Sequence, residues 1–239
     1  MNIVAFSDLH GQLPTLKKSA DIALIAGDVT PLQIQSSFKV SEKWFLSTFK
    51  EWAEALPVDH VFFIAGNHDF YLEEVSKSAE RINEFNAKLG DKITYIYNEV
   101  YECGEGKYGN TQGVRILGTP LCHVFGGWAF MPSDEKMKKA FNDIQLGGKV
   151  DIFLTHDAPY GTSDRLLQKT FYNTVVPGKH IGSVPLKEFI EVVEPSYCFH
   201  GHLHSTNHEV EKLGKTAVYN VSLLDERYEL VYEPLYINI

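Results

Sequence analysis

Short runs of apolar and β-branched residues recur along the chain, and they are continuous rather than alternating. Such runs are typical of strands that are buried on both faces of a sheet. Five of them stand out: NIVAFS at 2–7, DIALIA at 21–26, HVFFIA at 60–65, DIFLT at 151–155 and SYCF at 196–199. We therefore predict five buried strands that are spread over most of the chain.

Between these runs the apolar positions follow the wider spacing of helices. Helices are predicted at 38–55, 72–89, 133–146 and 183–193, with Ser133 and Ser183 as N-caps. After His204 the chain contains short strand-like pieces separated by turn residues such as Leu213-Gly214, which predicts hairpins. The glycine-rich stretch 104–127 is predicted to form one or more long loops.

Strand–helix alternation followed by strand-rich pieces predicts two packed sheets with helices outside. Hydrophobic residues make up 44% of the chain, which is ample for a packed core. No internal repeat or obvious linker interrupts the pattern, so we expect one domain over residues 1–239.

Charge and cysteine content narrow the class of protein. The net charge is −9 and no basic run is present, so long nucleic acid is not the expected partner. An acidic protein can still bind small phosphates when metal ions supply positive charge. Three cysteines without CxxC spacing, no signal-like N-terminus and no apolar run of about 18–20 residues predict a cytoplasmic protein without a membrane span. The oligomeric state stays open.

Residues able to bind metals follow each of the five apolar runs. They are Asp8 and His10, then Asp28, then Asn67 with His68 and Asp69, then His156, and finally His202 and His204. Taken singly, each of these residues fits a turn or an N-cap. The mostly parallel sheets of α/β proteins bind ligands beyond the carboxyl ends of their strands. The five groups of residues together therefore predict one pocket.

The donor types indicate which chemistry this pocket supports. Oxygen and imidazole donors without a thiolate suit Zn, Fe or Mn. Seven donors are too many for one tetrahedral ion but match two metal ions that share the Asp28 carboxylate. Two ions about 3.5–4 Å apart can deprotonate a water molecule and clamp a phosphoryl group. We therefore predict a dinuclear metal centre that hydrolyses a small phosphorylated substrate by a metal-bridging hydroxide.

The ordered motifs DLH, GD, GNHD, a lone histidine and GHLH resemble the signature of the calcineurin-like metallophosphoesterases. The resemblance implies a four-layer α/β/β/α sandwich of two mixed β-sheets flanked by helices. It also implies that His68 donates a proton to the leaving-group oxygen and is oriented by Asp69, a role that suits a histidine beside a carboxylate. The implied ligands are Asp8, His10, Asp28 and His204 for one metal, and Asp28, Asn67, His156 and His202 for the other.

The sequence departs from the motifs of other branches of the calcineurin-like metallophosphoesterases, and these differences narrow the expected class of substrate. Asp28 is followed by VTPL, and GNH by Asp69 rather than Glu, unlike the serine/threonine protein phosphatases. The segments GTPLCHVFGGWAF and THDAPYGTSD resemble a compact branch related to class III cyclic-nucleotide phosphodiesterases. This implies hydrolysis of small phosphodiesters, cyclic nucleotides among them. Phosphomonoester or nucleotide hydrolysis, or a catalytically silent scaffold, are the alternatives, although a scaffold has no need of the His68–Asp69 pair.

Other residues near these motifs have two interpretations each. The aromatic residues Phe125, Trp128 and Tyr108 could stack on a nucleobase or anchor the loops. His123 and Arg165 could contact the substrate or be solvated surface residues.

Two residues beside the predicted ligands need separate interpretation. Asp157 could hydrogen-bond a neighbouring histidine or cap a turn. His200 shares the spacing of His202 and His204, but the seven other donors already supply the ligands of both metal ions. We expect His200 to be structural and His200→Ala to retain both metals.

Overall fold

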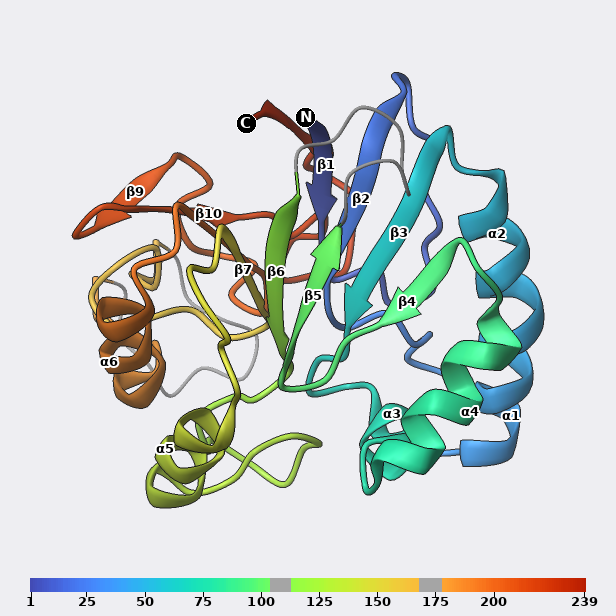
Figure 1. Cartoon of the computed structure of the whole chain (residues 1–239), viewed down its shortest axis with the longest axis horizontal. Coiled ribbons are helices and arrows are strands. Elements are labelled where there is room, and N and C mark those ends of the chain that lie inside the picture. Colours follow the sequence, from blue (N-terminus) through green and yellow to red (C-terminus); the bar gives the residue numbers. More distant parts are fainter. Residues whose placement is uncertain (104–112, 168–177) are drawn as a thin grey trace.

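Two β-sheets pack against each other, and helices cover the outer face of each (Figure 1). The structure is a computed structural model that describes residues 1–103, 113–167 and 178–239. The first sheet has the order β11-β1-β2-β3-β4. Its strands are β1 Asn2–Phe6, β2 Ala20–Ala26, β3 Val58–Ile64, β4 Ile93–Tyr95 and β11 Leu235–Asn238.

The second sheet has the order β5-β6-β7-β8-β10-β9. Its strands are β5 Glu99–Cys103, β6 Val114–Thr119, β7 Ile152–Thr155, β8 Tyr197–His200, β9 Glu211–Leu213 and β10 Thr216–Asn220. The strands β6, β7, β8 and β10 run parallel, and β5 and β9 are antiparallel to their neighbours. The predicted four-layer α/β/β/α arrangement of two mixed sheets is confirmed.

The five predicted strands are confirmed as β1, β2, β3, β7 and β8. Their continuous apolar pattern follows from burial on both faces. In β2, Ile22 and Leu24 join the core between the sheets, whereas Ala23 and Ile25 pack with the residues under the helices. Parallel pairing of β1, β2 and β3 directs their carboxyl ends to one edge of the sheet.

Helices on the first sheet follow most of the predicted segments. The segment 38–55 is α1 Phe38–Trp44, the π-helical turn η1 Phe45–Phe49 and α2 Lys50–Ala55. Phe49 packs on Phe63 of β3 with ring centroids 5.0 Å apart. The single helix predicted at 72–89 is wrong, because α3 Phe70–Val75 ends before α4 Ala79–Leu89 begins. The Ser78 hydroxyl accepts a hydrogen bond from the Arg81 N–H and so starts a new helix.

Helices α5 Asp134–Asp143 and α6 Val184–Val193 cover the second sheet (Figure 1). Phe189 of α6 packs on Phe153 of β7, with ring centroids 5.8 Å apart. The predicted Ser183 N-cap is confirmed by its bond from the Leu186 N–H at 3.2 Å. Ser133 precedes α5 but makes no side-chain cap bond.

Two expectations about loops and hairpins were wrong in part. The stretch 104–127 contains β6, because Ile116 and Leu117 are fully buried and pair with both β5 and β7. The predicted hairpin at Leu213-Gly214 is confirmed as β9–β10. The final strand β11 does not join it but pairs antiparallel with β1 in the other sheet, which brings the two ends of the chain together (Figure 1). The Met1 ammonium donates to the Ile239 carbonyl oxygen at 2.8 Å.

Candidate metal centre

Loops from both sheets meet at the carboxyl ends of their parallel strands. The Asp8 N–H donates to the Gly27 carbonyl oxygen at 3.0 Å, which ties the loop after β1 to the loop after β2. His156, which follows β7 in the other sheet, donates from Nδ1 to the Ala26 carbonyl oxygen at 2.7 Å. The predicted strand-end residues therefore converge on one site, as the sequence pattern indicated.

Asp28 lies at the middle of this site. Its Oδ2 is 3.5 Å from His10 Nε2, 3.4 Å from His156 Nε2 and 4.0 Å from His68 Nε2. Its Oδ1 accepts the His68 backbone N–H at 2.8 Å. Asn67 Oδ1 lies 3.2 Å from His156 Nε2. One carboxylate oxygen that faces imidazoles from three loops has the position expected of a ligand shared by two ions.

The Asp8 carboxylate forms the other half of the site. Its Oδ1 lies 3.1 Å from His204 Nε2, and its Oδ2 accepts the Ser222 hydroxyl at 2.7 Å. The His202 N–H lies 3.1 Å from both oxygens. On its far side His204 donates from Nδ1 to the Asp225 carbonyl oxygen at 2.9 Å.

His156 and His204 each donate a hydrogen bond from Nδ1 to a backbone carbonyl oxygen on the side away from the centre. These outer hydrogen bonds decide which ring nitrogen faces the centre. A carbonyl oxygen only accepts hydrogen bonds, so in both rings the proton resides on Nδ1. Nε2 of each ring then faces a carboxylate, and it offers a lone pair to a cation once its own proton is removed. Metal-ligating histidines commonly carry an outer bond of this kind.

The donors fit a pair of divalent metal ions. Asp8, His10 and His204 form one group whose ligand atoms lie within 4.8 Å of one another, and Asp8, Asp28 and His156 form a second. Both ring nitrogens of His10 are buried and have no hydrogen-bond partner among the described residues. A buried nitrogen without a partner costs about 1–3 kcal/mol, and a bound cation would satisfy it.

The backbone at the centre adopts a conformation that side chains rarely take. Four predicted ligands have positive φ: Asp8 at 57°, His10 at 43°, Asp28 at 52° and His202 at 68°. Such a residue costs about 1–3 kcal/mol, and residues of this kind tend to cluster at functional sites. Glycine is required beside them, because a Cβ on Gly66 would lie 2.6 Å from His156 Nε2 and one on Gly201 would lie 2.8 Å from Ser7 Cβ.

Charge is distributed unevenly over the histidines of the centre. Burial opposes protonation of His156 and His204, but the adjacent carboxylates outweigh it and raise their pKa values to about 10 and about 9. Burial prevails at His10 and His202, whose pKa values fall to about 4 and about 3. Burial likewise opposes ionisation of Asp8, yet the pairing with His204 holds the pKa of this carboxyl well below its usual range. A metal ion at the centre must therefore displace protons from two imidazoles.

His68 stands beside the centre with its ring held on two sides. Its Nδ1 lies 2.7 Å from Gln35 Oε1, and its ring packs on Trp128 with centroids 4.4 Å apart. An amide oxygen only accepts, so Gln35 keeps a proton on Nδ1 and leaves Nε2 toward Asp28. No local motif signals Gln35, which precedes His68 by 33 residues.

Among the described residues the Asp69 carboxylate makes no hydrogen bond to the His68 ring, so the orienting role expected from the sequence stays a prediction. The Asp69 carboxylate is fully buried and accepts the Thr30 hydroxyl at 2.5 Å. It also accepts three backbone N–H groups, those of Val29, Thr30 and Gly66. Because these donors lie on two loops, Asp69 holds the loop of Asp28 against the loop that carries His68.

Cys122 is a neighbour of the centre that sequence reasoning missed. Its Sγ, one ring nitrogen of His156 and one of His202 lie within 4.8 Å of one another. The residue is fully buried in the loop that follows β6. The strand-end rule would have found it, but the assignment of 104–127 to loops concealed the strand.

A second carboxylate–histidine pair flanks this part of the centre. Asp157 Oδ2 lies 2.8 Å from both the Nδ1 and the backbone N of His123, and its Oδ1 accepts the Ala158 N–H at 2.8 Å, so it bonds to a histidine and also to the backbone of its own loop. Burial opposes a charge on His123, but Asp157 outweighs it and raises the pKa of the imidazole. The Phe125 ring lies 5.2 Å from the His202 ring, and 53% of Phe125 is exposed.

His200 and Arg165 are not part of the donor clusters that the described residues form. His200 is fully buried at the end of β8 and donates from Nδ1 to the Gly201 carbonyl oxygen at 3.0 Å. The Arg165 Nε–H donates to the Gly178 carbonyl oxygen at 3.2 Å. Tyr108 lies outside the described residues.

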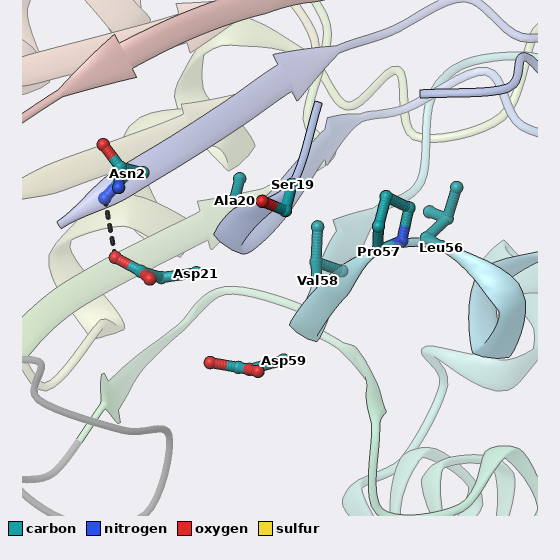
Figure 2. Close-up of a pocket in the computed structure, with 8 residues that line it drawn as sticks. All are labelled: Asn2, Ser19, Ala20, Asp21, Leu56, Pro57, Val58 and Asp59. Atoms are coloured by element: carbon teal, nitrogen blue, oxygen red, sulfur yellow. Dashed lines mark hydrogen bonds between the residues drawn. The ribbon is translucent and has the colours of Figure 1, made fainter. Parts of the chain in front are cut away.

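A hollow of about 520 Å³ opens at the opposite, amino-terminal ends of β1, β2 and β3 (Figure 2). Asp21 points into it and accepts the Asn2 N–H at 2.7 Å, and Asp59 lies across from it. Its eight lining residues include no imidazole. The donor clusters, by contrast, occupy the carboxyl ends of these strands.

The sequence matches the calcineurin-like phosphoesterase family over residues 1–206. The chain belongs to this family. Members of the family use divalent metals, and this chain is a metal-dependent phosphoesterase. The strands β9, β10 and β11 lie beyond the matched residues and complete both sheets.

Relatives of this phosphoesterase include human metallophosphoesterase domain-containing protein 1, which is 28% identical over 99% of the chain and 70% of that protein. The lariat debranching enzyme of Drosophila melanogaster is 29% identical over 59% of the chain and 28% of that enzyme. A solved structure of TT1561 from Thermus thermophilus has a TM-score of 0.58 and 16% identity, and it covers 99% of the chain and 98% of its own. That likeness confirms the fold.

Across the described ranges of this phosphoesterase, every helix is too short or too polar to span a lipid bilayer.

Proposed function

We propose that this phosphoesterase hydrolyses small phosphodiesters at a dinuclear metal centre. The observation that carries the proposal is the Asp28 carboxylate, whose Oδ2 faces His10, His156 and His68 at 3.4–4.0 Å. The residues that would hold the two ions are Asp8, His10, Asp28, Asn67, His156, His202 and His204.

The chain's own residues supply the proton that the leaving group needs. When bound, two divalent ions lower the pKa of a water molecule and neutralise charge on phosphoryl oxygens. His68 would donate a proton from Nε2 to the leaving-group oxygen, while Gln35 holds the proton on Nδ1. Proton donation of this kind contributes about 10²–10⁴-fold to a rate.

Aromatic side chains on both sides of the centre favour an organic diester over inorganic phosphate. Trp128 packs on the His68 ring, and the exposed Phe125 lies beside His202. Stacking of a base on such a ring is worth about 1–3 kcal/mol. The similarity to lariat debranching enzymes supports phosphodiester hydrolysis. Nucleotide diesters, including cyclic nucleotides, are therefore the substrates to test first.

The test compares bis(p-nitrophenyl) phosphate with p-nitrophenyl phosphate in the presence of Mn²⁺. We expect faster turnover of the diester and, in His68→Ala with both metals retained, a loss at the low end of about 10²–10⁴-fold, because p-nitrophenolate leaves readily. His180→Ala is the matched control, because the His180 ring bonds to Asp164 outside the donor clusters.

The leaving group makes the test of His68 sharper. The loss in His68→Ala should be larger for a diester with an alkoxide leaving group, because a poorer leaving group depends more on protonation. A faster monoester reaction would replace the proposal with phosphomonoester hydrolysis. Two bound metals without turnover of either ester would indicate a silent scaffold.

A further inference from the structure

The Cys122 sulfur lies close to two of the expected ligands of the second metal ion. This Sγ atom lies within 4.8 Å of a ring nitrogen of His156 and a ring nitrogen of His202, and these two nitrogens lie within the same distance of each other. Donors that lie 2.0–2.3 Å from one ion are about 3–4.5 Å apart. The three atoms therefore have a spacing that one cation can bridge.

The surroundings of Cys122 differ from those of the other cysteines. Cys103 is part of the core between the sheets, and Cys198 of β8 is part of the core under α6. Both positions are typical of a thiol that acts as a small apolar residue. The Cys122 sulfur instead lies near the imidazoles of His156 and His202, and its thiol donates to the Pro120 carbonyl oxygen at 3.4 Å.

An independent observation indicates that this centre takes cations. His10 is buried to all but 6%, and both of its ring nitrogens have no hydrogen-bond partner within the described ranges. Its Nε2 points at Asp28 Oδ2 at 3.5 Å, and the same oxygen lies 3.4 Å from His156 Nε2. The chain of donors is therefore continuous from His10 through Asp28 and His156 to Cys122.

We propose that Cys122 binds the second metal ion as a thiolate. The ion would be the one held by Asp28, Asn67, His156 and His202, so this inference rests on the proposed function. On binding, the S–H proton passes to the buffer and a sulfur–metal bond forms. Thiolate donors favour Zn²⁺ and other thiophilic ions over Mn²⁺. The second position is therefore selective for a thiophilic ion, whereas the first, with Asp8, His10 and His204, is not.

The test is a titration of the metal-free protein with Co²⁺, followed by absorption spectroscopy. Sulfur bound to Co²⁺ produces a charge-transfer band in the near ultraviolet, separate from the visible bands of the ion. We expect this band with one of two Co²⁺ equivalents, its loss in Cys122→Ser with the visible bands retained, and no change in the control Cys198→Ser. Two bound Co²⁺ ions without the band in the native protein would overturn the inference. Fewer than two bound ions would instead refute the dinuclear centre and the inference with it.

Two further measurements separate coordination from packing. Cys122→Ser should weaken Zn²⁺ binding at one site at least tenfold while Mn²⁺ affinity changes less; an equal loss for both ions would overturn the inference. X-ray absorption of the zinc-loaded native protein needs no variant and should show one sulfur at about 2.3 Å. A zinc shell of oxygen and nitrogen alone would also overturn it.

Discussion

Replacement of Asp69 tests whether this carboxylate acts on the structure or on the proton donor. Asp69→Ala removes the acceptor of three buried backbone N–H groups and of the Thr30 hydroxyl. Each buried donor left without an acceptor costs about 1–3 kcal/mol. Removal of the costly buried carboxylate offsets part of this sum. We expect a net loss of about 3–5 kcal/mol in the free energy of unfolding, because four donors lose their acceptor at once.

Asp69→Asn should lie between the native protein and Asp69→Ala. Its amide oxygen can keep the bonds from Thr30, but its NH₂ group would oppose the Gly66 N–H, which now donates to Oδ2 at 2.7 Å. We expect a loss of about 1–3 kcal/mol. The assay is urea unfolding of the metal-free protein, with diester turnover measured at saturating metal.

His68→Ala serves as the comparison, because it should lower the rate and leave the unfolding free energy within about 1 kcal/mol. The structural reasoning would be refuted if Asp69→Ala unfolded like the native protein and yet lost as much activity as His68→Ala. That result would support the role expected from the sequence, in which Asp69 acts through the His68 ring.

Three further predictions concern the metals and the proton donor. Gly66→Ala should lower metal content while the fold persists, because its Cβ would lie 2.6 Å from His156 Nε2; metal analysis of the folded variant with full occupancy would contradict this. His156 and His204, with pKa values raised to about 10 and about 9, stabilise the metal-free protein below pH 6.5, and this stabilisation is lost as the pH rises through 9 to 10. Metal affinity should depend on pH in the opposite direction, because the ion must displace the protons of these two rings. Calorimetry at pH 7 should therefore detect proton release, and the affinity should rise with pH. A pH-independent affinity would count against the two protonated rings. Gln35→Glu should extend activity to higher pH, because a carboxylate beside Nδ1 favours the protonated ring; an unchanged pH–rate profile would remove Gln35 from the positioning of the proton donor.

Some expectations from the sequence stay predictions. They are a single domain over residues 1–239, a cytoplasmic location, and the assignment of each ligand to one metal. The spectroscopic titration described for Cys122 also tests the last of these, because it counts the ions and separates the two positions.

The sequence by itself determined the five central strands and the residues that follow them. Continuous apolar runs predict buried parallel strands, and the carboxyl ends of such strands meet at one edge. Asp8, Asp28, Asn67, His156 and His202 could therefore be placed in one pocket without coordinates. Local pattern was sufficient because each of these residues lies within three residues of the end of its strand.

Tertiary structure decided the contacts that join segments distant in sequence. Gln35 reaches the His68 ring from another loop. The Asp69 carboxylate bonds to the loop of Asp28 and not to the ring of the adjacent His68. The last strand, β11, pairs with the first strand of the chain. Cys122 comes to the centre only because β6 occupies a place in the second sheet beside β7. Periodicity reports which face of an element is buried, but it carries no information on which loops meet, because that depends on how the elements pack in three dimensions.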